Sequence, residues 1–243
     1  MHNIDHTNEA ILAQEYDSLQ SDQESSDANS HKNHPVIVPI RSLGANHAGR
    51  IAKHLFALDE NDRYLRFGHH AQDAQVQRYV DSLNFDRDEI FGIYNRKLEL
   101  IAMAHLAYAK DMGYENCAEF GASVLAGSRG RGFGARLFER AAMHATNDGI
   151  SMMYIHALSK NDAMLRIARN AGAAVEYDGT ESEAFLRLPQ PSMNSIVTEM
   201  LEEQLAQTDY RLKVQAKQFR EFLASMQEDL LGITHNIDDK SQK

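Results

Sequence analysis

The residues best suited to chemistry in this sequence are the glycines and arginines of one stretch, GSRGRGFGARLF at positions 127–138. The residues before it, EFGASVL, are typical of a strand, and those after Gly134, ARLFERAAMHAT, are typical of a helix. The first turn of a helix has backbone N–H groups without intrahelical partners and a partial positive charge, so it binds phosphate readily. Gly130, Gly132 and Gly134 would leave this backbone accessible, and Arg129 and Arg131 would add charge. The stretch therefore predicts a pyrophosphate-binding loop.

Glycine content alone fits an alternative equally well, a tight turn between a strand and a closely packed helix. Two familiar phosphate-binding loops do not fit. The P-loop needs a Gly-Lys-Ser or Gly-Lys-Thr sequence that is absent here. The Rossmann loop has another glycine spacing and follows the first strand of its unit, whereas this loop follows about the fourth predicted strand.

The elements that must position this loop are predicted from apolar spacing and turn residues. Asn95–Lys97 is expected to be a hairpin turn, Asn161 a helix N-cap, and Gly172 the residue that ends that helix. The predicted strands span 36–40, 89–95, 98–109, 117–125, 150–158, 173–177 and 183–188. The predicted helices span 43–59, 73–83, the residues after Gly132, 161–172 and 193–233. This order predicts an α/β (α+β) fold with a mixed sheet.

Two motifs resemble those of a known family. Arg129-x-x-Gly132-x-Gly134 after a strand resembles the acyl-CoA signature Q/R-x-x-G-x-G/A of the GNAT superfamily of N-acyltransferases. The helix from Asn161 to Gly172 resembles the second motif of that family, at the expected separation, and the order of elements over 36–189 is similar. Within the family, AEFGASVLAGSRGRGFG, NDAMLRIARNAGA and DRYLRFG look most like bacterial Pat-type protein-lysine acetyltransferases.

The resemblance implies acetyl-CoA as acyl donor and two flanking strands that splay apart to admit the thioester. The loop would hold the pyrophosphate, and the end of the preceding strand would pair its backbone with the pantetheine arm. The implied cofactor-binding residues are Ala122, Ser123, Val124, Arg129, Gly130, Arg131, Gly132, Phe133, Gly134, Ala135 and Asn161. None of the twelve histidines has a metal-site spacing such as H-E-x-x-H, so no metal is expected.

Acetyl transfer to an amine needs a base, because an ammonium group has no lone pair and a lysine amine has a pKa near 10.4. The resemblance implies Glu119, ten residues before Arg129, for this role. In many family members a tyrosine seven residues after the motif Asn acts as general acid for the leaving thiolate. This chain has Ala168 at that position. Tyr64, Arg66 and Phe67 are candidates for the acceptor side or for helix packing.

Charge and composition divide the chain. The net charge of −10 argues against general binding of nucleic acid or anionic membranes. Residues 1–35 carry seven acidic residues and one lysine and are predicted to be a disordered acidic segment. Residues 36–189 are the predicted acetyltransferase domain, and 190–243 a C-terminal helical region. One cysteine, no apolar run of about 20 residues and no secretory signal favour the cytoplasm.

The C-terminal region has apolar residues at helical spacing, with a seven-residue repeat from Ala216 to Ile233. A coiled-coil-like helix that mediates self-association or docks a partner protein is one interpretation. A helix lying along its own domain is the other.

The favoured function is acetyl-CoA-dependent N-acetylation of a primary amine, either a protein lysine or a small molecule, with Glu119 as general base. The alternative from another class is an acyl-CoA-binding regulatory module that signals through the C-terminal helix.

Overall fold

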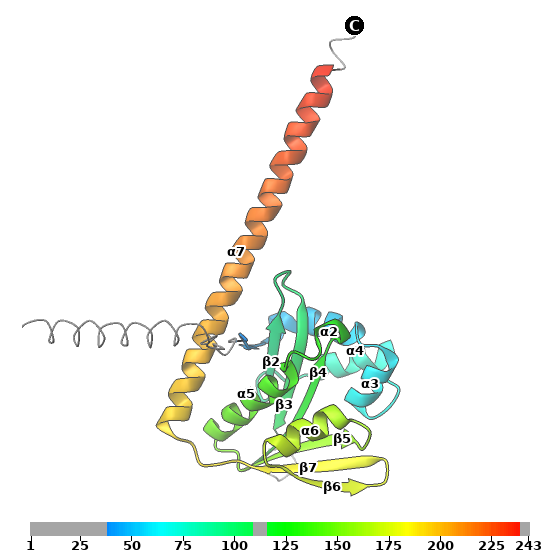
Figure 1. Ribbon diagram of the computed structural model, residues 1–243, viewed down its shortest axis with the longest axis vertical. Coiled ribbons are helices and arrows are strands. Elements are labelled where there is room, and N and C mark those ends of the chain that lie inside the picture. The colour runs from blue at the N-terminus through cyan, green and yellow to red at the C-terminus, as the bar shows by residue number, and fades with distance from the viewer. Residues whose placement is uncertain (1–37, 109–115, 239–243) are drawn as a thin grey trace, which may run out of the picture. The chain divides into compact units, whose positions relative to one another are not determined.

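The computed structural model describes residues 38–108 and 116–238, apart from the side chains of Phe219 and of 222–238. The acidic segment predicted at 1–35 lies outside the described residues. The helices follow one another as α2 (Ala48–Phe56), α3 (Glu60–Phe67), α4 (Asp73–Asp81), α5 (Phe133–Asn147), α6 (Asp162–Asn170) and α7 (Met193–Asp238), shown in Figure 1.

The described strands form one mixed sheet in the order β1-β2-β3-β4-β5-β7-β6. Only β4 and β5 pair in parallel; they are joined by the crossover helix α5, as a parallel connection requires. The bounds are β1 (Arg41–Ser42), β2 (Glu89–Tyr94), β3 (Leu100–Tyr108), β4 (Cys117–Val124), β5 (Met152–Leu158), β6 (Ala174–Asp178) and β7 (Glu181–Arg187).

The hairpin predicted between the second and third strands is confirmed. Asn95 bonds to the Glu99 carbonyl through its backbone N–H, and its side-chain oxygen accepts from the N–H groups of Lys97 and Glu99. The helix boundaries predicted around α6 are confirmed as well. The side chain of Asn161 accepts a hydrogen bond from the Met164 N–H, and Gly172 has a left-handed φ of 87°.

Alternating side chains give the sheet two apolar faces, each covered by helices (Figure 1). On one face Ile51 and Leu55 of α2 and Val76 of α4 pack with Met103 of β3. On the other face α5 and α6 cover the strands, and the rings of Phe120 and Phe138 meet with centroids 5.0 Å apart. The glycine loop between β4 and α5 therefore starts from a strand that is fixed on both sides.

One expected strand was wrong, and one helix was not expected. Residues 38–40, the described part of the predicted strand 36–40, form no strand. Strand β1 begins at Arg41, directly after the predicted strand was expected to end. Pro39 has no N–H to give to a sheet, which accounts for the shift. The helix α3 was not predicted, because its apolar residues are few; it is set by caps instead. The Asp59 carboxylate accepts from the Asp62 N–H, and Gly68 ends the helix at a φ of 75°.

Candidate active site

The glycine loop adopts a backbone that only glycine takes without strain. After β4, a short 3-10 turn at Ala126–Ser128 leads into Gly130 and Gly132, whose φ angles are 73° and 74°. A Cβ built on either residue would meet no atom within 4 Å, so the space above the loop is open. A Cβ on Gly134 would lie 3.1 Å from Ile167 of α6. The first two glycines thus form an open cradle, and Gly134 lets α5 approach α6.

A cavity of about 620 Å³ opens above this cradle. It is enclosed by the end of β4, the glycine loop, the first turn of α5, and side chains from α3 and α6. Its lining residues are Leu58, Asp62, Leu65, Arg66, Ala122, Ser123, Val124, Ser128, Arg129, Gly130, Gly132, Phe133, Gly134, Ala135, Asn161, Ala163, Met164, Arg166, Ile167 and Asn170.

Every predicted cofactor-binding residue except Arg131 lines this cavity. The Arg131 guanidinium instead lies 4.8 Å from the centre of the Phe133 ring. Arg166 of α6 lines the cavity and was missed. The helical spacing of Ala163, Arg166 and Asn170 after Asn161 could have indicated it, since these positions share one helix face.

Strand β4, which borders the cavity, separates from β5 as the family resemblance implied. β4 and β5 pair at three positions, Cys117 with Met152, Ala118 with Met153 and Glu119 with Tyr154. Both strands continue, β4 to Val124 and β5 to Leu158, without further pairing to each other. The opening between them begins directly after Glu119.

Glu119 lies at the inner end of this opening and not in the lining of the cavity. Because side chains alternate along a strand, it shares a face of β4 with Gly121 and Ser123. Its side chain is exposed. Burial raises the pKa of nearby Tyr79, and the negative charge of Glu119 adds to that effect, so the two groups are close enough to interact.

A series of hydrogen bonds connects the buried Asp88 to Arg66. Arg66 lies beside Gly121, on the same face of β4 as Glu119. The buried Asp88 carboxylate accepts from His105 Nε2 at 3.2 Å, so the other ring nitrogen of His105 accepts from the Tyr79 hydroxyl at 2.8 Å. The Tyr79 oxygen in turn accepts from Arg66 Nη2 at 2.7 Å. Burial lowers the pKa of His105, and the charge of Arg66 lowers it further, so this imidazole is neutral.

Gly121 leaves room for the position of Arg66 at the end of these hydrogen bonds. A Cβ at that position would lie 2.8 Å from Arg66 Nη1, so the guanidinium rests directly on the β4 backbone. Of the three candidates for the acceptor side, Arg66 lines the cavity. Phe67 packs against the apolar cluster of α2 and α4, and the Tyr64 ring stacks on His70 and lies 4.0 Å from Lys160 Nζ.

Ser123 is fixed by a buried histidine. His54 Nδ1 donates to the Leu100 carbonyl at 2.9 Å, which leaves Nε2 to accept from the Ser123 hydroxyl at 2.8 Å. Burial lowers the pKa of His54 to about 4, so the ring stays neutral near pH 7. The pair anchors the end of β4 to α2.

Arg129 forms an ion pair with Asp62, and this contact joins α3 to the glycine loop. Asp62 is the only carboxylate in the cavity lining, which also contains Arg66, Arg129 and Arg166. The lining is therefore net positive, which suits a phosphate-bearing ligand.

Among the described residues, no tyrosine lines the cavity to replace the general acid that many family members have at the position of Ala168. That residue is fully buried in the core, where it cannot reach the cavity. Neither Tyr154 nor Tyr177 is in the lining; Tyr154 packs on Phe185, and Tyr177 is exposed and bonds to Arg169. Within residues 38–108 and 116–238, no group of three His, Cys, Asp or Glu side chains is arranged to hold a metal. None of the helices in those ranges is long and apolar enough to cross a membrane.

Comparison with known proteins agrees with this geometry. The family model described as Acetyltransferase (GNAT) family matches residues 53–173. The GNAT domain of PAT from S. lividans superposes with a TM-score of 0.54 at 19% identity, covering 63% of this chain and 95% of that one. Spermidine N-acetyltransferase from Vibrio cholerae, solved with CoA and spermine, has a TM-score of 0.50 at 15% identity and covers 62% and 95%.

A GNAT-family acetyltransferase from Staphylococcus aureus Mu50 gives a TM-score of 0.50 at 13% identity, covering 63% of this chain and 99% of that one. No curated protein sequence matches the chain. At these identities the solved structures show a shared fold, and the family model covers the glycine loop and α6, which line the cavity. Residues 53–173, just under half of the chain, therefore match the GNAT acetyltransferase family, and the described fold is that of GNAT structures.

Proposed function

We propose that the protein transfers an acetyl group from acetyl-CoA directly to a primary amine, within a complex that holds both substrates. The observation that carries this proposal is the continuity of the cavity. It joins an open glycine cradle at a helix N-terminus to Ala122–Val124, the end of β4 beyond its last pairing with β5. A pyrophosphate fits the first feature and a thioester arm fits the second.

The residues of the cavity fit acetyl-CoA, which would supply an activated acyl carbon as a thioester. Backbone N–H groups of the loop, with Arg129 and Arg166 beside it, would bind the phosphates. The exposed edge of β4 at Ala122–Val124 would pair with the pantetheine arm, as another strand would. To bind phosphate, Arg129 would have to give up part of its contact with Asp62.

Glu119 is the proposed base, acting directly or through one water. It would take one proton from the ammonium, and the amine nitrogen would then form a bond to the acyl carbon. The C–S bond would break with its electron pair on sulfur, and the nitrogen would release its second proton to solvent. The thiolate would leave without a tyrosine acid, since Ala168 is buried and no described tyrosine lines the cavity. The Pat-type resemblance is compatible with such a departure.

A protein lysine is the proposed acceptor, with a small-molecule monoamine as the closest alternative. The V. cholerae enzyme was solved with spermine, a polycation. A polycation fits this cavity poorly, because three arginines and one ion-paired aspartate line it. The motif resemblance to Pat-type enzymes supports the lysine.

Calorimetry with acetyl-CoA, followed by a thiol assay for released CoA, tests the proposal. Gly132→Val should weaken acetyl-CoA binding by at least about tenfold, because valine is strained at a left-handed φ and fills the cradle. Gly127→Ala is the matched control: this loop glycine has no positive φ and open space around it, so affinity should not change.

Release of CoA with a lysine peptide would support the proposed acceptor. Binding without CoA release for any amine would contradict catalysis and favour the acyl-CoA-binding regulatory module. No binding at all would contradict the cradle itself.

A further inference from the structure

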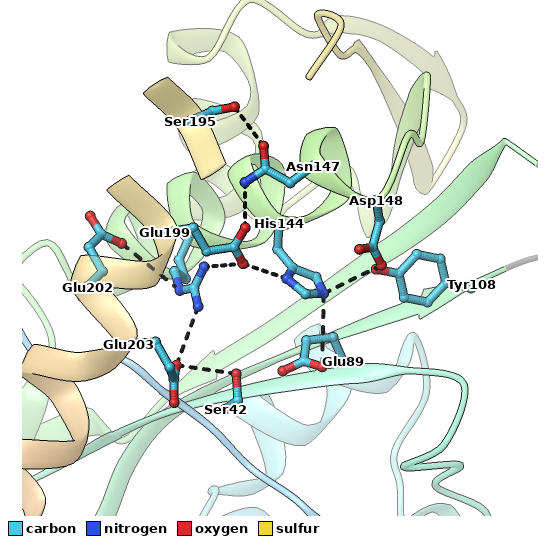
Figure 2. Close-up of polar contacts among 11 residues, drawn as sticks. Ser42, Glu89, Tyr108, His144, Asn147, Asp148, Ser195, Glu199, Glu202 and Glu203 are labelled. Carbon is cyan, nitrogen blue, oxygen red and sulfur yellow. Dashed lines mark hydrogen bonds and ion pairs between the residues drawn. The ribbon is translucent and has the colours of Figure 1, made fainter. Parts of the chain in front are cut away.

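The long helix α7 contacts the rest of the protein through its charged side (Figure 2). Glu199 accepts hydrogen bonds from Arg140 Nη1 and His144 Nδ1, both at 2.6 Å, and from the Asn147 amide of α5. Glu203 accepts from the second Arg140 nitrogen at 3.4 Å. The Arg140 side chain is only 3% exposed, so these two glutamates compensate a positive charge that water cannot solvate.

The next two turns of α7 continue this contact along the edge of the sheet. Ala206 is buried, and the Tyr210 ring lies between Tyr94, at 5.2 Å between centroids, and the Arg41 guanidinium at 4.0 Å. Lys213 Nζ donates to the Tyr94 carbonyl at 3.0 Å. We call Glu199, Glu203, Ala206, Tyr210 and Lys213 the inner face of α7.

The opposite side of α7 is apolar and exposed. Val197, Leu201, Leu205 and Leu212 are 48%, 60%, 51% and 60% exposed, and we call them the outer stripe. At about 100° per residue they fall within about 80° of one another, and their centre is about 150° from that of the inner face. Six of the eight large hydrophobic residues that are exposed in the described part of the chain belong to this helix.

This arrangement inverts the usual amphipathic helix, which turns its apolar side to its own domain. The inner contacts already fix how α7 is oriented, so the domain cannot also cover the outer stripe. An apolar strip of this length is the signature of an interaction surface. The sequence extends it, because the repeat from Ala216 to Ile233 follows at the spacing that continues the same side of the helix.

We infer that the outer stripe is a dimer interface and that its occupant is α7 of a second copy of this chain. Helix α7 runs to Asp238, so a strip that follows the sequence repeat from Val197 to Ile233 would be about 55 Å long. With a helix width of about 10 Å it would offer about 550 Å² per helix. Two such faces give about 1,100 Å², above the roughly 1,000 Å² expected of a specific interface.

A second copy fits this surface better than an unrelated protein for two reasons. A seven-residue apolar repeat packs well against an identical helix, and twofold homodimers are the commonest oligomers. Residues 190–243 carry nine acidic and six basic residues, so two such helices repel each other only weakly.

Pairing through the outer stripe would leave both cavities open. The inner face binds α5 at Arg140, His144 and Asn147, whereas the cavity lies at the other end of α5, at Phe133–Ala135. Two acetyltransferase domains would therefore be carried on one central helix pair.

Analytical ultracentrifugation of the full chain from about 1 to 100 µM tests the inference. The wild type should sediment with twice the chain mass of 27.4 kDa. Leu201→Glu with Leu205→Glu should reduce the mass to one chain. Gln204→Glu with Gln218→Glu adds the same two charges at exposed positions beside the stripe and should remain a dimer. Circular dichroism and acetyl-CoA affinity should be unchanged in both variants.

A wild type of one chain mass over the whole range would overturn the inference and point to a different partner. A dimer that persists in the double-leucine variant would overturn it as well, by placing the interface elsewhere. Should that variant fail to fold, Leu212→Glu, a single exposed change, gives the same test. The measurement does not depend on catalysis, so a failed acetylation assay leaves its result intact.

Discussion

Glu119 occupies the last position at which β4 and β5 still pair, and its side chain is exposed. A carboxylate there can receive a proton from an amine that enters between the strands. Because the proposed phosphate-binding residues lie at the other end of β4, the proposed role of Glu119 can be tested separately from acetyl-CoA binding.

Glu119→Gln is therefore expected to lower kcat by about 10²-fold, the usual contribution of a general base, and to leave acetyl-CoA affinity within about twofold. Steady-state kinetics with a lysine peptide and calorimetry measure the two effects. Glu176→Gln, an exposed glutamate on β6, is the control and should have normal kinetics. Equal turnover in both variants would remove Glu119 from the mechanism.

The Tyr79 hydroxyl joins Arg66 to the buried Asp88–His105 pair. Tyr79→Phe should free the Arg66 guanidinium from its place over Gly121 and lower kcat by about tenfold, while acetyl-CoA binding stays unchanged. Tyr64→Phe removes a hydroxyl from the neighbouring helix as a matched control. A Tyr79→Phe enzyme with wild-type kcat would show that the hydrogen bonds from Asp88 to Arg66 stabilise the fold and do not affect catalysis.

At the scale of elements, the contact between α5 and α7 depends on ionisation. Glu199 holds the pKa of His144 above its ordinary value of 6.5, despite burial, and bonds from His144, Asn147 and Arg140 lower the pKa of Glu199 to about 2. Figure 2 shows His144 and Asn147 of α5 meeting Glu199 of α7. The pair stabilises the contact most while both groups are charged.

Because the folded pKa of His144 is raised, its contribution is complete below pH 6.5 and is lost as the pH rises through the folded value. The contribution of Glu199 is complete above pH 4.5 and is lost as the pH falls toward 2. We therefore expect the thermal stability of the wild type to exceed that of His144→Gln most between pH 4.5 and 6.5, and this excess to shrink above that range. A difference in Tm that does not change from pH 5 to 9 would contradict this.

At the scale of the whole molecule, α7 covers the edge strand β1 and neutralises Arg140. A chain ending at Pro191 would lose these ion pairs together with the packing of Ala206 and Tyr210 against the domain. A loss of about 2 kcal/mol corresponds to roughly 5 °C in Tm for a domain of this size. Calorimetric scanning of the truncated and full chains measures this, and equal Tm values would mean that α7 contributes nothing to the domain.

Truncation and outer-stripe substitution separate the two roles of α7. Loss of the helix should remove both stability and the dimer, whereas the double-leucine variant should lose the dimer with the inner contacts intact. The domain boundaries at 36 and 189 remain predictions, and the same truncation tests the one at 189.

The sequence by itself determined the glycine loop, the order of most elements and the caps of α6. These depend on local physics: only glycine takes a left-handed φ cheaply, and Asn161 caps its own helix. It also determined the apolar repeat of α7, because the repeat consists only of the types of the residues and their spacing along the sequence.

Only the tertiary structure decided what those features face. Whether α7 would turn its apolar or its charged side inward depended on Arg140 and His144, about 55 residues away on α5. Arg66 needed Gly121, Tyr79, His105 and Asp88 from four separate segments to fix it over β4. Such contacts join residues distant in sequence, so neither spacing nor composition carries them, and they arise only when the sheet brings the segments together.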